Sequence, residues 1–242
     1  MVTLFNRMQK SLCESSIDVE NSGTTCSILI INDKTVEVSG DSLSIEFIHS
    51  LYLLSSFYCE VYNIGDSKAV LARRMITDGK LSATTLTEDH TPEVPLESER
   101  VKSCGGEIYS NSMNVSGHSP KTGPLRVWFP CEKTSGLIGL AMTRSWGDAA
   151  AHRVGVISEP HKEIISLQDH DEFIIFASDG IWDAIPNAVE FVDYYISSLP
   201  PIQNKSDWDP QEAARRLVVH ARKLWEKNAY IDDITCFVIR IK

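Results

Sequence analysis

The stretch FIIFASDGIWD, residues 173–183, is the part of the sequence that best indicates the fold. Phe173 to Ala177 is an unbroken apolar run of strand length, which predicts a buried strand. Ser178-Asp179-Gly180 ends that strand and leaves a charged Asp179 where the chain leaves the core. Turn chemistry is one explanation, because aspartate and glycine are common in turns. The other is that the strand presents Asp179 as a ligand to a metal ion.

Composition indicates a folded protein with an acidic surface. The chain has 242 residues, 43% of them hydrophobic, and a formal net charge of −10. This much apolar material supplies a core, so wholesale disorder is excluded. The negative charge argues against a nucleic-acid partner, since phosphate backbones are bound by basic patches. It is compatible with ordinary solubility and with cation binding.

Cysteine usage and the lack of long apolar segments predict an intracellular protein. The six cysteines have no C-x-x-C pair and are expected to be reduced thiols: Cys13, Cys26, Cys59, Cys104, Cys131 and Cys236. No apolar run reaches the length of a membrane span, and the N-terminus lacks the apolar block of a secretory signal. We expect a cytoplasmic or nuclear protein with no membrane partner.

Periodicity and turn residues predict strands mixed with helices in one domain, residues 1–242. A polar loop is expected over 110–123, and the segment 39–58 is either an inserted loop or a helix. The helices are expected over 3–12, 91–104, 186–199 and from Asp209-Pro210 onward. The strands are expected over 26–31, 35–38, 61–64, 69–73, 125–129, 173–177 and 235–241, with 61–64 and 69–73 forming a hairpin.

Three acidic positions share one setting, at the boundary of a strand. Asp66 and Asp179 each follow a predicted strand, and Asp232-Asp233 directly precedes another. If the strands pair, these ends meet, and clustered carboxylates repel one another unless a cation neutralises them. Mg²⁺ and Mn²⁺ take oxygen ligands, and Mg²⁺ keeps several waters, so few protein ligands are needed. Their recurrence at strand boundaries favours a divalent-cation site, although each aspartate alone is more often a turn residue than a ligand.

Other chemistries lack support in the sequence. There is no G-x-x-x-x-G-K-[ST] loop for a nucleotide and no G-x-S-x-G elbow for a serine hydrolase. His220 lies in a predicted helix among apolar residues, where partial burial is expected. His90 stands in EDHTPE before a predicted helix, where capping or local hydrogen bonding is a better explanation than catalysis.

Taken together, these segments resemble the metal-dependent protein phosphatases of the type 2C class. The motifs that carry the resemblance occur in the family's order across residues 22–242. They are SGTTC from Ser22, VYNIGDSKAVL from Val61, LTEDHTPEVPLESERV from Leu86, GLAMTRSWGD from Gly139, VISEP from Val156, FIIFASDGIWD from Phe173 and DDITCFVI from Asp232.

The resemblance implies an α+β fold, a sandwich of two antiparallel sheets flanked by helices. It implies hydrolysis of phosphoserine and phosphothreonine in protein substrates by a metal-activated water, with Mg²⁺ or Mn²⁺ as cofactor and up to two ions in the family. Asp179 and Asp232 match family metal ligands, and Asp66 matches a carboxylate of a further, weaker site. Asp233 is not expected to be a ligand, and Gly147-Asp148 is expected to be structural. A monomer is expected.

The sequence lacks the first segment of the family, which carries an arginine that holds phosphate, an acidic residue on the second metal and central strands. The Asp-Gly-His run, whose aspartate bridges two metals and whose histidine is the proton donor, does not occur; the Asp-Gly pairs are Asp78-Gly79 and Asp179-Gly180. The expectation is an N-terminally incomplete domain with one weak ion site and catalytic residues that the sequence does not identify. The alternative is a catalytically impaired pseudophosphatase or fragment that acts as a binding or regulatory module. A third hypothesis is a partner-binding protein that uses segments 39–58 and 110–123.

Overall fold

The computed structural model describes residues 1–32, 57–112, 122–131, 136–200, 208–227 and 232–241. The strand expected over 35–38, most of the segment 39–58, and the centre of the loop over 110–123 lie outside these residues.

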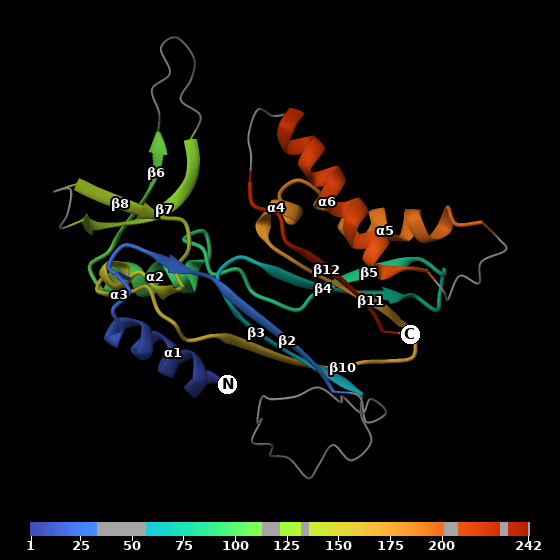
Figure 1. Ribbon diagram of the computed structural model, residues 1–242, viewed down its shortest axis with the longest axis horizontal. Helices are drawn as coiled ribbons and strands as arrows, with labels where there is room; N and C mark the ends of the chain where they lie inside the picture. The colour runs from blue at the N-terminus through green and yellow to red at the C-terminus, as the bar shows by residue number, and fades with distance from the viewer. Residues whose placement is uncertain (33–56, 113–121, 132–135, 201–207, 228–231, 242) are drawn as a thin grey trace.

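Two antiparallel sheets form the centre of the molecule (Figure 1). In the first sheet the strand order is β10-β3-β2, and in the second it is β12-β11-β4-β5. The strands of the first sheet are β2 (Cys26–Asn32), β3 (Tyr58–Ile64) and β10 (His161–Ser166). Those of the second sheet are β4 (Lys68–Arg74), β5 (Leu81–Thr85), β11 (Asp171–Ala177) and β12 (Cys236–Arg240).

β11, inside the second sheet, is covered on both faces, which explains its unbroken apolar run. Phe173 and Ile175 on one face join the cluster that packs under the helices, whereas Ile174 on the other face packs with Val61 of β3. Successive strand residues point to opposite faces, so a strand covered on both sides must be apolar throughout. The predicted sandwich with flanking helices is confirmed.

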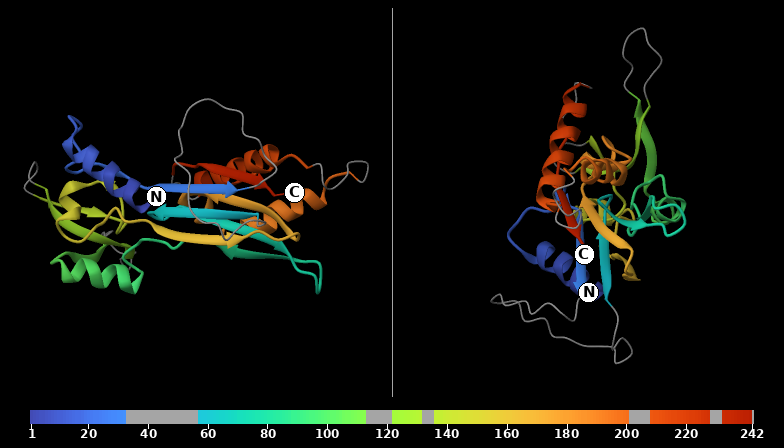
Figure 2. Two further views of the ribbon diagram at one scale, coloured as in Figure 1. Left: turned by 90° about the horizontal axis from the view of Figure 1, so that it is seen from below. Right: turned by 90° about the vertical axis from the view of Figure 1, so that its right-hand side faces the viewer.

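Two long helices cover the outer face of the second sheet, on the side away from β2, β3 and β10 (Figure 2). These are α5 (Ala188–Ser197) and α6 (Pro210–Lys227), and the short α4 (Asp179–Trp182) directly follows β11. Asp209 caps α6, since its Oδ1 accepts the Gln211 backbone N–H at 2.9 Å. The predicted helix is present as α6, and its inner face is apolar at helical spacing, with Ala213, Leu217 and Ala221 buried.

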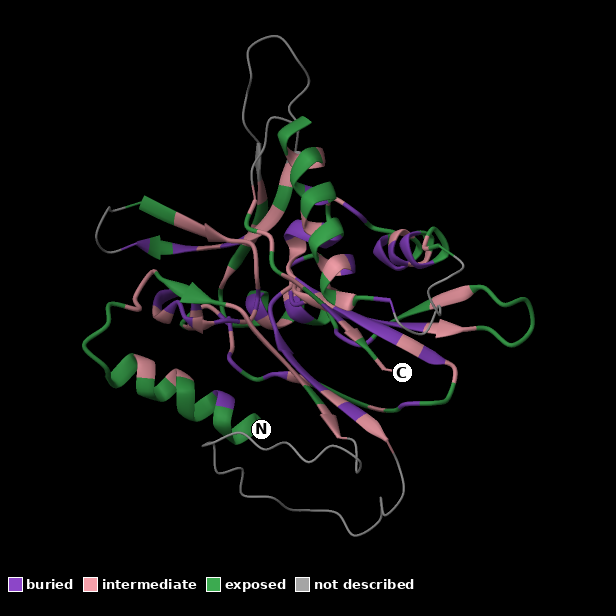
Figure 3. Ribbon diagram, turned by 45° about the vertical axis from the view of Figure 1, so that its right-hand side comes forward, coloured by how far each residue is buried: buried purple, intermediate pink, exposed green. Residues whose placement is uncertain are grey.

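A smaller sheet and three further helices complete the described structure. The sheet has the order β6-β7-β8, and β1 pairs with β9 elsewhere. These strands are β1 (Gly23–Thr24), β6 (Glu107–Ser112), β7 (Thr122–Cys131), β8 (Gly136–Leu140) and β9 (Trp146–Gly147). The helices are α1 (Val2–Glu14), α2 (Pro95–Ser103) and α3 (Ala149–His152). Figure 3 shows that α1 is exposed along most of its length, whereas the central strands are largely buried.

The Gly147-Asp148 motif lies at the contact between α1 and β9. The Gln9 side chain donates to the Gly147 carbonyl at 2.9 Å and accepts the Gly147 N–H at 2.7 Å. Asp148 is buried and has a left-handed backbone, with φ of 43°. These contacts fix the course of the chain between β9 and α3, which agrees with the structural role expected for the motif.

Three expectations need correction. The hairpin predicted over 61–64 and 69–73 is wrong, because β3 and β4 belong to different sheets and the turn between them carries the chain from one sheet to the other. The helix predicted over 91–104 begins only at Pro95, after a turn in which the Val94 N–H donates to the Thr91 carbonyl. His220 is exposed, since it lies on the outer side of α6.

Candidate metal centre

The register of the second sheet brings the three predicted acidic segments to the same end of its strands. Ala177, the last residue of β11, lies opposite Lys68 of β4 on one side and Cys236 of β12 on the other. β11 is antiparallel to both neighbours, so its C-terminal end meets their N-terminal ends. Asp179 follows Ala177 by two residues, Asp66 precedes Lys68 by two, and Asp232 precedes Cys236 by four. All three therefore leave the sheet at the same place.

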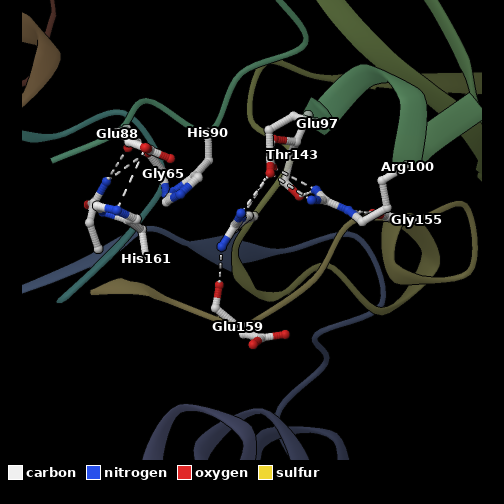
Figure 4. Close-up of polar contacts among 11 residues, drawn as sticks. Gly65, Glu88, His90, Glu97, Arg100, Thr143, Gly155, Glu159 and His161 are labelled. Atoms are coloured by element: carbon white, nitrogen blue, oxygen red, sulfur yellow. Dashed lines mark hydrogen bonds and ion pairs between the residues drawn. The ribbon is translucent and has the colours of Figure 1, made fainter. Parts of the chain in front are cut away.

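The turn that carries Asp66 is held by a buried histidine. Gly65 has a φ of +104°, and a Cβ at this position would lie 2.2 Å from the Thr25 side chain, so glycine is required. The Gly65 N–H donates to Nδ1 of His90 at 3.2 Å, and the His90 N–H donates to the Gly65 carbonyl at 3.0 Å (Figure 4). The local hydrogen bonding expected for His90 is what the structure shows.

The turn that carries Asp179 is hydrogen-bonded to the segment that carries Asp232. Ser178 Oγ donates to the Asp233 carbonyl at 3.2 Å and accepts the Thr235 N–H at 3.1 Å. The backbones approach so closely that a Cβ on Gly180 would lie 2.3 Å from the Asp233 carbonyl oxygen. Glycine at position 180 thus allows Asp179 and Asp232 to lie on adjacent turns.

The electrostatics of the turns indicate that these carboxylates act on one another. Burial, followed by the charge of Asp179, raises the pKa of Asp66 to about 6. Burial, followed by the charge of Asp232, raises the pKa of Asp179. Both shifts mean that the folded protein disfavours the charged forms while no cation is present. A cation bound among these carboxylates would remove that penalty.

Two further carboxylates and one lysine belong to this cluster, and the sequence analysis missed all three. Asp183 and Asp89 both act on the pKa of Asp66. Lys68 forms an ion pair with Asp89 at 2.8 Å, and its charge opposes the burial that raises the pKa of Asp183. Asp183 lies four residues after Asp179, a spacing that places both on one side of a helical turn, so this pattern was a usable signal.

The donor set fits a hard divalent cation as a partial site. All of the clustered acidic side chains offer carboxylate oxygens, which Mg²⁺ and Mn²⁺ prefer. Across the described residues, however, no three His, Cys, Asp or Glu side chains converge into a complete group that holds an ion. Asp179 Oδ1 accepts the Gly180 N–H at 2.9 Å, and Asp232 Oδ1 accepts the Asp233 N–H at 2.8 Å, so one oxygen of each is already engaged.

A buried network of ion pairs lies next to the loop that contains His90 and links α2 to the segment before β9. Glu97 is 3% exposed and accepts bidentate hydrogen bonds from Arg100, both at 2.7 Å, and another from Arg144 at 2.7 Å (Figure 4). Burial would raise the pKa of Glu97, but the hydrogen bonds from Arg100, Arg144 and Thr143 together lower it to about 2. The Thr143 N–H also donates to the His90 carbonyl at 2.8 Å, so the network supports the loop that holds the Asp66 turn.

Comparison with known proteins agrees with this fold. The family model of protein phosphatase 2C matches residues 4–228. The chain is 39% identical to probable protein phosphatase 2C 64 of Oryza sativa subsp. japonica over 73% of the chain and 37% of that protein. It is 31% identical to probable protein phosphatase 2C 35 of Arabidopsis thaliana, over 98% of the chain and 61% of that protein. The chain therefore belongs to the protein phosphatase 2C family, and it spans only part of the length of these relatives.

Solved structures show the same fold at low sequence identity. A serine-threonine phosphatase 2C from Toxoplasma gondii superposes with a TM-score of 0.58 at 20% identity, over 76% of this chain and 55% of that one. A sex determining protein of C.elegans superposes with a TM-score of 0.54 at 20% identity, over 76% and 37%. The chain thus spans 55% and 37% of the length of these two solved proteins.

Proposed function

We propose that the chain is the metal-binding part of a protein serine/threonine phosphatase of the type 2C class. In this proposal Asp66, Asp179 and Asp232 are ligands for Mg²⁺ or Mn²⁺, and Asp183 is added to them. The observation that carries it is the strand register, in which Asp66, Asp179 and Asp232 leave the second sheet at the same end of its strands. Family membership supports the reaction, the hydrolysis of phosphoserine and phosphothreonine.

The residues of this chain have separable tasks in that reaction. The carboxylates would hold the cation, and Lys68 pairs with Asp89 at 2.8 Å beside them. The His90 and Ser178 hydrogen bonds keep the turns in place, so the carboxylates need little reorganisation when an ion binds. Divalent cations, when bound, lower the pKa of water and neutralise phosphate charge.

The remaining expectations follow from the same proposal. We propose that residues 1–242 form one domain, that the protein works as a monomer in the cytoplasm or nucleus, and that it acts on phosphorylated proteins. The six cysteines are thiols on separate elements, in line with a reducing compartment. In the described part of the chain, no helix is both long and apolar enough to cross a membrane.

Hydrolysis of a small aryl phosphate and of a phosphothreonine peptide tests this function directly. With Mn²⁺ present we expect slow turnover, several orders of magnitude below ordinary phosphatase rates, that chelator removes. Asp179→Asn should abolish it, and Glu99→Gln on the exposed side of α2 should leave it unchanged.

Two results would contradict the proposal. Turnover that survives chelator and Asp179→Asn would show that these carboxylates are not the metal site. A chain that binds Mn²⁺ in a titration, loses that binding with Asp179→Asn and yet shows no turnover would be a binding module rather than an enzyme.

A further inference from the structure

The helices α5 and α6 enclose a groove on the outer surface, away from the sheet that they cover. The helices run antiparallel, because the Phe191 ring stacks on His220 at 5.0 Å and Arg216 lies over the Tyr195 ring at 4.7 Å. The groove between them has a volume of about 380 Å³. Its lining comes from both helices: Phe191, Tyr194, Tyr195, Ser198, Arg215, Arg216, Val219, His220 and Lys223.

The groove presents apolar surface that the core does not use. Both helices already bury another face, with Val192 of α5 and Leu217 of α6 fully inside the core. On the groove side, Tyr194 is 77% exposed and Val219 is 41% exposed. Removing apolar area from water is favourable by roughly 25 cal/mol per Å², so burial of the exposed Tyr194 ring against a partner would stabilise a complex.

The charge of the groove is opposite to that of the protein. The described residues that line it include two arginines and a lysine and no acidic side chain, whereas the chain carries a net charge of −10. Glu212 at the margin already accepts two hydrogen bonds from Arg215, at 2.6 and 2.8 Å, and one from Arg216 at 2.7 Å, so a further carboxylate would pair with Lys223 and the other N–H groups of Arg216. Hydrogen bonds between such cations and a carboxylate are charge-assisted and stronger than neutral ones.

We propose that this groove is a docking site for a protein segment that carries a carboxylate next to an apolar side chain. The apolar side chain packs on Phe191 and Tyr194, and the carboxylate pairs with the cations of α6. Tyr and Arg are the residue types most enriched at binding hot spots, and both line the groove. The small size predicts a weak, transient complex with Kd on the order of 10 µM.

The docking site is separate from the carboxylate cluster but is connected to it through α6. Near the C-terminal end of α6, the Trp225 indole N–H donates to the Gly180 carbonyl at 2.8 Å, next to Asp179. A segment bound along α6 is therefore held on the helix that buttresses the proposed metal site. The inference concerns binding alone, so it does not depend on whether the chain hydrolyses phosphate.

A random peptide display library tests the proposal even though the partner is unidentified. The library is selected on the whole chain, and the enriched peptides are then measured by fluorescence anisotropy on the chain and on the double variant Tyr194→Ser/Lys223→Glu. The matched control is Leu96→Ser/Lys102→Glu on α2. It removes an equally exposed apolar side chain, 77% exposed at Leu96, and makes the same change of charge.

We expect the enriched peptides to combine Asp or Glu with an apolar residue. Their affinity should fall at least tenfold on the groove variant, stay unchanged on the control, and weaken with salt. Peptides that bind the groove variant equally well, or a consensus that contains no acidic residue, would overturn the proposal. Circular dichroism and urea unfolding of both double variants check that the fold is retained, which the exposure of all four side chains favours.

Discussion

Nδ1 of His90 lies 3.2 Å from the backbone nitrogen of Gly65 and accepts its hydrogen bond, so a single imidazole holds the turn on which Asp66 stands. The imidazole is 1% exposed, and burial, followed by the charge of Arg144, lowers its pKa to about 3. The ring is therefore neutral at physiological pH, with Nδ1 as acceptor and the proton on Nε2. The local hydrogen bonding expected from the sequence thus holds the turn that carries Asp66.

Replacement of His90 should destabilise the protein markedly. His90→Ala leaves a buried backbone donor unpaired and opens a cavity, which should lower the free energy of unfolding by about 3 kcal/mol. His90→Gln supplies another acceptor and should recover part of this loss. Urea unfolding measures both variants, with His170→Ala in a partly exposed loop as the control. A loss below about 0.5 kcal/mol for His90→Ala would show that the hydrogen bond is not important.

The Glu97 network should make stability depend on acid pH. Because the pKa of Glu97 is lowered to about 2, the unfolded chain binds the proton first, and the stabilisation is complete above about 4.5. It is then lost as the pH falls from about 4.5 towards 2. Glu97→Gln should cost about 3 kcal/mol at pH 7, since it leaves Arg100 and Arg144 poorly paired.

The difference between the parent and Glu97→Gln should shrink through that pH window. Denaturant unfolding from pH 7 to pH 2.5 measures it, with Glu163→Gln at an exposed position as the control. A difference that stays constant with pH would mean that Glu97 is not the titrating group.

Removal of one clustered carboxylate should change stability with opposite sign in the absence and presence of metal. Without cation, Asp179→Asn removes a charge that burial and Asp232 disfavour, and should raise the melting temperature. With Mn²⁺ at ten times its Kd, the parent should gain about 1.4 kcal/mol and the variant much less. Thermal unfolding across a Mn²⁺ titration checks both signs. A variant that responds to Mn²⁺ as the parent does would exclude Asp179 as a ligand.

Gly180 should be irreplaceable despite lying in a helical turn. Alanine is the better helix former, yet its Cβ would lie 2.3 Å from the Asp233 carbonyl and push the Asp232 segment away. We expect Gly180→Ala to lower stability by about 2 kcal/mol or more and to weaken Mn²⁺ binding.

Gly79→Ala is the matched control for Gly180→Ala. It meets no atom within 4 Å and carries only the strain of a φ of +69°. It should cost about 1 kcal/mol and leave Mn²⁺ binding unchanged. Equal Mn²⁺ affinity for the parent and Gly180→Ala would contradict the role assigned to the close approach.

Local sequence patterns predicted helices and strands correctly where the pattern lies within a single segment. The apolar run before Asp179 became β11, and the periodic apolar residues after Asp209 became the inner face of α6. The turn at Gly65 shows the limit of such patterns. Its residues look like a hairpin turn, but β3 and β4 pair with other strands. Turn residues fix the direction of the chain locally, whereas strand pairing depends on partners far away in the sequence.

The order of residues along the chain was enough to place a carboxylate at each of three strand boundaries: Asp66, Asp179 and Asp232. That the three carboxylates lie at the same end of the sheet follows from the packed fold. Antiparallel pairing of β11 with both β4 and β12 brings the C-terminal end of β11 next to the N-terminal ends of its two neighbours. The packed fold also brings Asp183, Asp89 and Lys68 close together, so that the charges of Asp89 and Lys68 act on the pKa of Asp183. Charge, hydropathy and turn propensity are properties of a segment, but proximity is a property of the packed chain.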